Sequence, residues 1–162
     1  MNIYRSIPVS GGGVAWVDQR DYPMLSTWHW HHNLRGYAMR NVKRGAGWRP
    51  TFMHRFIMLP DPDQQVDHIN GNHLDNRRDN LRLCTNAENH ANLSIPANNT
   101  SGYKGVSKSR RRWRASIGQR GQCTHLGVFA SAVDAALAYD LAAIRLFGEY
   151  ARPNFLTTGT VA

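Results

Sequence analysis

The chain has 162 residues, enough for one ordinary domain or two small ones. Its 20 Lys and Arg residues against 11 Asp and Glu give a formal net charge of +9, which favours a polyanionic partner such as nucleic acid. No apolar stretch approaches the ~20 residues of a membrane-spanning helix, and residues 1–9 lack the apolar segment of a signal peptide. Cys84 and Cys123 form no CxxC pair, which argues against a disulfide framework and a cysteine zinc site. We therefore expect a soluble, intracellular protein.

The charge is unevenly distributed along the chain. From Ser101 to Val133 there is no acidic residue, although this segment is rich in Lys and Arg. Six of the 11 acidic residues fall in the central segment, namely Asp61, Asp63, Asp67, Asp75, Asp79 and Glu88. A centre that can chelate a metal, followed by a basic segment, indicates that the chemistry and the docking of a polyanion reside in different parts of the chain.

Residues 1–50 are predicted to be a β-rich supporting region. Val14–Val17 and Gly36–Arg40 are strand-like runs, and residues 21–28 look like a helical turn with Asp21 as N-cap. The aromatic residues here either form a compact core or stack on bases, and packing is the commoner role. They are Trp16, Trp28, Trp30, Tyr37 and Trp48. The histidines at 29, 31 and 32 are expected to be surface or packing residues, because no further metal ligand is placed near them.

Residues 51–93 carry a compact pattern of short elements. Residues 51–58 are predicted to form a short helix or strand that ends before Pro60. A strand over Val66–Ile69 is followed by Asn70-Gly71, a strong turn signal, and Asn80–Cys84 is predicted to return as the second strand. A short helix over Asn86–Leu93 is expected to end before Pro96.

The central segment also spaces polar residues in an informative way. Asp67 directly precedes His68 at the end of an apolar run, and Asn80 and Asn89 follow that histidine by 12 and 21 positions. A hard divalent cation prefers carboxylate and amide oxygens, and a histidine beside such an ion can take a proton from water. This pattern predicts metal-assisted phosphodiester chemistry.

The order and spacing of these residues resemble the HNH nuclease motif in the variant common in phage and intron-encoded homing endonucleases. The resemblance implies a ββα-metal fold with Asp67 and Asn89 as ligands of Mg²⁺ or Mn²⁺. It also implies that His68 is the general base and that Asn80 braces the loop. A shift of one residue on the last helix would exchange Asn89 for His90, so both remain candidates. Arg77, Arg78 and Arg82 are either phosphate contacts or solvated hairpin charges, and His54-Arg55 resembles a supporting or phosphate-contacting pair.

Residues 94–101 read as a linker, and residues 102–155 as a second small domain. Strands are predicted to start at Gly102–Val106 and to cover Arg112–Ile117 and Cys123–Phe129. Ser131 begins a capping-box pattern for an alanine-rich helix that runs to about Phe147 and stops at Gly148.

This second domain resembles the Apetala/ethylene-response-factor (AP2/ERF) DNA-binding domain. The residues that carry the resemblance are Tyr103–Val106, Trp113–Ile117, Leu126–Phe129, Ala135–Asp140 and Asn154-Phe155. In that family a three-stranded sheet lies in the major groove and the helix braces its back. Alternation along the second strand turns Trp113, Ala115 and Ile117 toward the helix and leaves Arg112 and Arg114 outward. The resemblance implies DNA contacts from Lys104, Lys108, Arg110, Arg112, Arg114 and His125, although the plant domains commonly carry a tryptophan at the position of His125.

The sequence thus predicts an α+β protein, with a ββα-metal nuclease core and a small three-stranded antiparallel sheet packed on one helix. The predicted function is a homing-type HNH endonuclease that acts on double-stranded DNA in a bacterial or phage-infected cell. The alternative is a DNA-binding regulator whose nuclease module is inactive, and an RNA-directed nuclease is a weaker third hypothesis. Residues 156–162 are expected to be a tail. The target site, the number of strands cut and the oligomeric state are left open.

Overall fold

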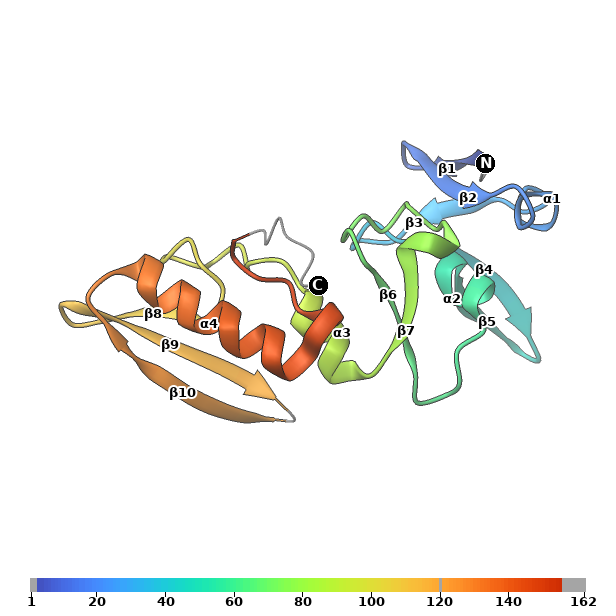
Figure 1. Cartoon of the computed structure of the whole chain (residues 1–162). Helices are drawn as coiled ribbons and strands as arrows, with labels where there is room; N and C mark the ends of the chain where they lie inside the picture. The colour runs from blue at the N-terminus through green and yellow to red at the C-terminus, as the bar shows by residue number, and fades with distance from the viewer. Residues whose placement is uncertain (1–2, 120, 156–162) are drawn as a thin grey trace. The chain divides into compact units, whose positions relative to one another are not determined.

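The computed structural model describes residues 3–119 and 121–155, so the predicted tail at 156–162 lies outside the described residues. The chain divides into two compact units, residues 1–85 and residues 86–162 (Figure 1). This boundary falls inside the 51–93 segment that was expected to form one nuclease core. Both units combine strands with short helices, which confirms the α+β class. Among the described residues, no helix is both long and apolar enough to cross a membrane.

A five-stranded sheet with the order β2-β1-β3-β4-β5 dominates the first unit. Only the β1–β3 pairing is parallel, and the other neighbours are antiparallel. The predicted strand at Val14–Val17 is confirmed as β2, whereas the run from Gly36 begins its strand only at Ala38 because Gly36 occupies a turn with φ +80°. The strands are β1 (Tyr4–Ser10), β2 (Val14–Asp18), β3 (Trp30–His32), β4 (Ala38–Arg44) and β5 (Gly47–Phe52).

The expected helical turn is present as α1 (Tyr22–Leu25), but it is shorter than the predicted span. Asp21 occupies the N-cap position without capping the helix through its side chain. Its carboxylate instead accepts two hydrogen bonds from the guanidinium of Arg78, at 2.8 and 2.9 Å. The predicted capping role of Asp21 was therefore wrong, because a long-range ion pair takes the side chain.

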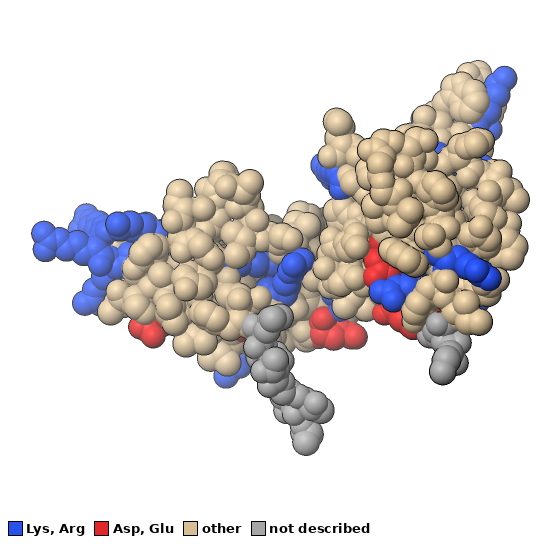
Figure 2. All heavy atoms as spheres, turned by 90° about the horizontal axis from the view of Figure 1, so that it is seen from above, with Lys and Arg blue, Asp and Glu red and all other residues tan. Residues whose placement is uncertain are grey.

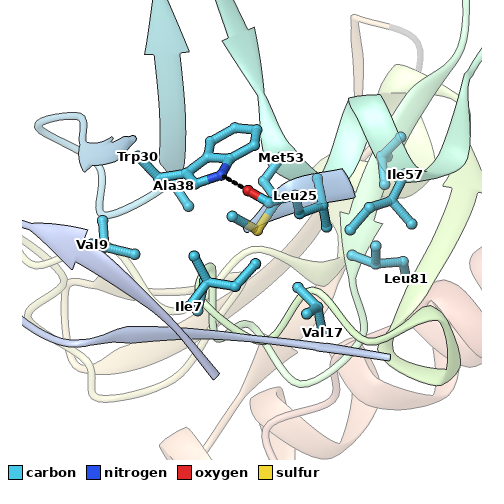
Figure 3. Packing of buried hydrophobic residues seen from close by; sticks show 11 residues of the cluster. Ile7, Val9, Val17, Leu25, Trp30, Ala38, Met53, Ile57 and Leu81 are labelled. Carbon is cyan, nitrogen blue, oxygen red and sulfur yellow. Dashed lines mark hydrogen bonds between the residues drawn. The ribbon is translucent and has the colours of Figure 1, made fainter. Parts of the chain in front are cut away.

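The core of the first unit lies between this sheet and a short helix, α2 (Met53–Met58) (Figure 3). Trp30 is almost fully buried there, and its indole Nε1 donates to the Leu25 carbonyl at 2.9 Å. Trp16 and Trp48 are 45% and 68% exposed, so the expected aromatic core includes Trp30 but not these two residues. The buried members of the core are Ile7, Val9, Ala15, Val17, Leu25, Trp30, Ala38, Met53, Ile57, Val66 and Leu81.

A two-stranded antiparallel sheet completes the first unit. It pairs β6 (Gln65–His68) with β7 (Leu81–Cys84), in a register that places His68 opposite Leu81. A single 3-10 turn, η1 (Arg78–Asn80), leads into β7. Both predicted strands are confirmed, and the loop of residues 69–80 that joins them opens with the predicted turn, in which the Gly71 N–H donates to the His68 carbonyl at 2.8 Å.

The second unit begins with α3 (Asn86–Asn92) and continues into a three-stranded antiparallel sheet with the order β10-β9-β8. The strands are β8 (Val106–Ser109), β9 (Arg112–Gln119) and β10 (Gln122–Phe129). Helix α4 (Ala132–Phe147) packs on one face of this sheet, and the 3-10 turn η2 (Gly148–Tyr150) follows it. Ser131 caps α4 by accepting from the backbone N–H of Asp134 at 3.0 Å, as predicted.

The packing of this sheet follows the predicted alternation. Ala115 and Ile117 are buried and Trp113 is half-buried, whereas Arg112 and Arg114 are exposed. Alanines dominate the buried stripe of α4, namely Ala135, Ala136 and Ala143, so the helix can lie close to the sheet. Asp140 on the same helix accepts hydrogen bonds from the backbone N–H groups of Asn154 and Phe155, which hold the end of the domain.

The strand predicted to start at Gly102 begins only at Val106, because Gly102 and Gly105 adopt positive φ of +77° and +73° in the preceding turn. A Cβ on Gly105 would overlap the ring of Tyr139 and lie 2.8 Å from the Ser116 carbonyl oxygen. A Cβ on Gly102 would meet no atom within 4 Å. The close approach of backbone to helix therefore requires glycine at position 105.

We expect Gly105→Ala to destabilise the second unit more than Gly102→Ala does. Both substitutions place a Cβ in left-handed backbone, at a cost of roughly 1–2 kcal/mol, but only Gly105→Ala adds overpacking of about 1–3 kcal/mol. Hydrogen exchange of the β9 and α4 amides measures the difference. Equal protection in the two variants would contradict this account of the turn.

Candidate active site

Asp67 and His68 lie together at the end of β6, and both are nearly buried, at 5% and 3% exposure. The register of the hairpin places Arg82 of β7 directly opposite Asp67. Arg82 Nη2 lies 2.7 Å from Asp67 Oδ2, and Arg82 Nε donates to the same oxygen at 2.9 Å. Arg82 is therefore an ion-pair partner of Asp67 rather than the solvated hairpin charge that was one of its two predicted roles.

Asn80 ties together the two ends of the loop that follows His68. Its side-chain oxygen accepts from the backbone N–H of Asn70 at 3.0 Å, and its Nδ2 donates to the Asp75 carbonyl at 2.8 Å. The backbone of Asn80 accepts from the N–H of Ile69, directly after His68, at 2.9 Å. These bonds restrain the position of the histidine backbone.

The N-terminal sheet holds the middle of the same loop. Trp16 of β2 donates its backbone N–H to Leu74 and accepts from that of Asn76, each at 2.8 Å. Asp18, at the end of β2, accepts from the backbone N–H of Arg78 at 2.7 Å. The expected supporting region is thus joined to the loop by backbone hydrogen bonds.

The other two arginines of the loop are also paired inside the protein. Arg77 binds Asp75 at 2.6 Å, and Arg78 binds Asp21 at 2.8 Å. Both guanidinium groups stay about one-third exposed. Both arginines are therefore partly exposed ion-pair partners of carboxylates, and their predicted alternative role as phosphate contacts stays a prediction.

His68 belongs to a group of stacked and edge-on rings. The ring centroids of His54 and His73 lie 5.0 and 5.5 Å from that of His68. Tyr37 stacks on His73 at 3.8 Å and also contacts His54 at 5.1 Å. His73 Nδ1 lies 2.8 Å from the carbonyl oxygen of Arg35, which fixes that ring. The general-base candidate is therefore enclosed by side chains from β6, α2, the 69–80 loop and the N-terminal region.

Burial lowers the pKa of His68 and of His54. Burial, and then the charge of His73, lowers the pKa of His68 to about 4. The hydrogen bond to Asn76 and the carboxylates of Asp67 and Asp75 act in the opposite direction and raise this pKa. Burial, followed by the charges of His68, Arg55 and His73, lowers the pKa of His54 to about 3. A neutral imidazole retains the lone pair that a general base needs.

Asn76 is the polar neighbour that orients His68. It is fully buried, and its Oδ1 lies 3.4 Å from His68 Nε2. Within residues 3–119 and 121–155, the buried Asn76 Nδ2 and His54 Nδ1 have no hydrogen-bond partner. Unsatisfied buried polar atoms are uncommon away from functional sites, so their position beside His68 supports a role in binding polar groups.

The last two metal-ligand candidates lie on α3, in the second unit. Asn89 is half-buried there, and His90 is exposed. No group of three or more His, Cys, Asp or Glu side chains among the described residues could hold a metal by itself. A carboxylate such as that of Asp67 and an amide oxygen such as that of Asn89 are ligand types that suit a hard divalent ion.

The predicted DNA-contacting residues fall into two groups. Lys108, Arg110, Arg112, Arg114 and His125 are exposed on the sheet of the second unit or on its turns. Figure 2 shows Lys and Arg side chains gathered at the end of this unit where the β8–β9 turn lies. Lys104 differs, because it is partly buried and its ammonium donates to the carbonyls of Ala91 and Leu93 at the end of α3. Burial lowers the pKa of Lys104 to about 8, and the two carbonyl contacts occupy the ammonium that was predicted to contact DNA.

Comparison with known proteins identifies the family. The HNH endonuclease family model matches residues 59–91. The chain is 34% identical to an uncharacterized HNH endonuclease of Acanthamoeba polyphaga mimivirus, over 88% of this chain and 75% of the relative. This protein belongs to the HNH endonuclease family. It is therefore a nuclease by its family.

Two shorter similarities cover parts of this chain. Protein 3.8 of Escherichia phage T7 is 46% identical over 35% of this chain and 49% of its own length. An ethylene-responsive transcription factor of Arabidopsis thaliana is 50% identical over 35% of this chain and 23% of its own length. No solved structure matches the chain significantly.

Sequence reasoning missed three residues of this site. Asn76 stands in the first of two Asp-Asn pairs, at 75–76 and 79–80, and a role was predicted only for Asn80 of the second pair. His73 follows His68 by five positions, which the strong turn signal at Asn70-Gly71 obscured. Tyr37 carries no local signal, because only the folded chain brings it to His73.

We expect the first unit to lose stability as the pH falls below about 6.5. His54 has a folded pKa of about 3 against an ordinary value of 6.5, so the unfolded chain binds more protons between these values and stability declines with acidification. At about pH 5 the loss from this one group is roughly 2 kcal/mol, since one pKa unit corresponds to about 1.4 kcal/mol. Urea unfolding at about pH 7.5 and about pH 5 measures it.

The matched variant is His54→Phe, which keeps an aromatic ring and removes the titrating group. Its stability should fall by about 2 kcal/mol less than that of the wild type over the same pH interval. An identical loss in both proteins would show that His54 is not kept neutral by burial.

Proposed function

We propose that this protein is a homing-type, divalent-metal-dependent endonuclease that cuts double-stranded DNA after docking through its second unit. The observation that carries the proposal is a neutral, buried and oriented His68 directly beside Asp67. Family membership supports the nuclease chemistry, and the contacts around His68 support the roles proposed for the individual side chains. The viral relatives and the resemblance to homing endonucleases support the homing assignment.

His68 is proposed as the general base. If its Nε2–H donates to Asn76 Oδ1, the lone pair lies on Nδ1, where it can accept a proton from the attacking water. Asn80 and Asn76 are positioning residues, because one restrains the loop backbone and the other the ring. His54 and His73 exclude water from the faces of His68 and so keep it neutral.

Asp67 and Asn89 are proposed as the residues that hold a divalent ion, Mg²⁺ or Mn²⁺, with His90 as the alternative to Asn89. When bound, such an ion would stabilise negative charge on the scissile phosphate and on the leaving oxygen. Asp67 shares its carboxylate with Arg82, which keeps the side chain fixed for this task.

The second unit is proposed to bind duplex DNA through the face of its sheet that α4 does not cover. Arg112 and Arg114 are exposed on β9, and Lys108 and Arg110 lie at its β8–β9 end. The similarity to part of a plant transcription factor supports this surface. Phosphate neutralisation by these cations would supply affinity with little sequence information.

We expect His68→Ala to lower the single-turnover cleavage rate by ~10²–10⁴-fold while DNA affinity stays close to that of the wild type. The reason is that the imidazole acts on the water and not on the phosphates that hold the duplex. Cleavage of plasmid DNA with Mg²⁺, measured at saturating enzyme, reads the rate, and a filter-binding titration without divalent ions reads affinity.

The control for this variant is His29→Ala, because His29 is an exposed histidine of the same unit. It should cut at the wild-type rate. Omission of Mg²⁺ should abolish cleavage by the wild type, and Asp67→Asn should raise the Mg²⁺ concentration needed for half-maximal rate. Unchanged cleavage by His68→Ala, or cleavage independent of divalent ions, would overturn the proposed mechanism.

We expect the double variant Arg112→Ala/Arg114→Ala to weaken binding to duplex DNA. Loss of two phosphate contacts should reduce the slope of log affinity against log salt by ~1.8, at ~0.9 for each contact. Arg145→Ala, an exposed cation on α4, is the control and should leave the slope unchanged. Wild-type salt dependence in the double variant would place the docking face elsewhere.

A further inference from the structure

The β4–β5 hairpin of the first unit is a basic ribbon at the edge of the large sheet. Residues 38–52 contain four cations and no acidic residue, namely Arg40, Lys43, Arg44 and Arg49. β5 is the edge strand, and the tip of the hairpin points away from β1 and β2 (Figure 1). Neither the proposed mechanism nor the docking sheet of the second unit uses this element.

The strand register distributes the side chains over both faces of the ribbon. Lys43 lies opposite Trp48, and Val42 lies opposite Arg49. Alternation therefore places Lys43 and Trp48 on one face and Arg44 and Arg49 on the other. The two-residue tip at 45–46 contains Gly45 with φ +58°, which permits a tight reversal. The result is a narrow, two-stranded arm with cations on both sides.

Three of the four cations are available for a partner. The guanidinium of Arg40 lies 3.5 Å from the ring centroid of Trp28, so this residue anchors the base of the ribbon. Lys43, Arg44 and Arg49 are exposed, and within the described residues none of them forms an ion pair. Their charge is therefore not neutralised by the protein.

Protection of an edge strand explains only part of this pattern. Charged side chains and a proline such as Pro50 on an edge strand discourage pairing with another chain. Edge protection does not explain Trp48, because this large apolar side chain is 68% exposed on that strand and would favour association. An exposed tryptophan among uncompensated cations is typical of a surface that meets a nucleic acid.

We propose that the β4–β5 hairpin is a second DNA-contacting element, which lies in the major groove of the duplex that the enzyme cuts. A two-stranded β-ribbon fits that groove, with cations on both faces directed at the phosphates of the two flanking strands. Trp48 contributes apolar contact inside the groove. The inference rests on the proposed function in that the partner is the DNA substrate, and it assigns to the first unit an affinity of its own.

The test uses the full-length protein and a labelled duplex of random sequence, in buffer without divalent ions so that no cutting occurs. The triple variant Lys43→Ala/Arg44→Ala/Arg49→Ala should lower the slope of log affinity against log salt by ~2.7, since three contacts contribute ~0.9 each. Trp48→Ala should weaken binding with the slope unchanged. Arg20→Ala, an exposed cation of the same unit outside the ribbon, is the control and should bind as the wild type.

The proposal is overturned if either ribbon variant binds as the wild type, or if Arg20→Ala weakens binding as much as the triple variant does. An acidic protein partner for the ribbon would appear as the first of these outcomes. A urea unfolding midpoint equal to that of the wild type shows that the variants are folded. Wild-type protein that binds through the ribbon but fails to cut DNA with Mg²⁺ would sink the proposed function alone.

Discussion

The attachment of the 69–80 loop to the edge of β2 is the interaction on which the candidate active site depends. A two-stranded hairpin is at best marginally stable by itself, and a loop of this length between its strands would be mobile without further contacts. Trp16 forms two backbone hydrogen bonds with the loop, and the carboxylate of Asp18 accepts a further hydrogen bond from the backbone N–H of Arg78. The N-terminal sheet thus determines where the loop lies, and the loop in turn carries His73, Asn76 and Asn80.

The same attachment accounts for the state of His68. With the loop in place, the rings of His54, His73 and Tyr37 surround it, and Asn76 supplies a polar contact to Nε2. Burial among these rings disfavours the protonated imidazole, which lowers its pKa to about 4. The protein therefore keeps its candidate base unprotonated through burial, and burial also fixes the ring in one orientation.

Acidic and basic functions are separated along the chain. Arg82 and both arginines of the 69–80 loop form ion pairs with carboxylates of the first unit. These cations therefore help to hold the loop and the hairpin in place. Other exposed cations lie on the sheet of the second unit and on the β4–β5 ribbon, and within the described residues no ion pair is formed by Lys108, Arg112, Arg114, Lys43, Arg44 or Arg49. This division leaves the exposed cations of the surface able to attract a polyanion, while the cations near Asp67 are neutralised by carboxylates.

The sequence by itself determined the elements with strong local signals. The capped helix from Ser131, the alternation of β9 and the strands on both sides of the 69–80 loop follow from periodicity, capping and turn chemistry, which act over a few residues. The roles of Asp67, His68 and Asn80 were implied by the resemblance to the HNH motif, and the family match covers that segment.

Only the tertiary structure decided which partners these residues have. Asp21 binds Arg78 and does not cap α1, Lys104 donates to backbone carbonyls, and Arg82 pairs with Asp67. Each of these partners lies far away in sequence or on a neighbouring strand. Tyr37, His54 and His73 reach His68 for the same reason. Long-range contacts depend on how the sheets and loops pack, and no local pattern in the chain records that packing.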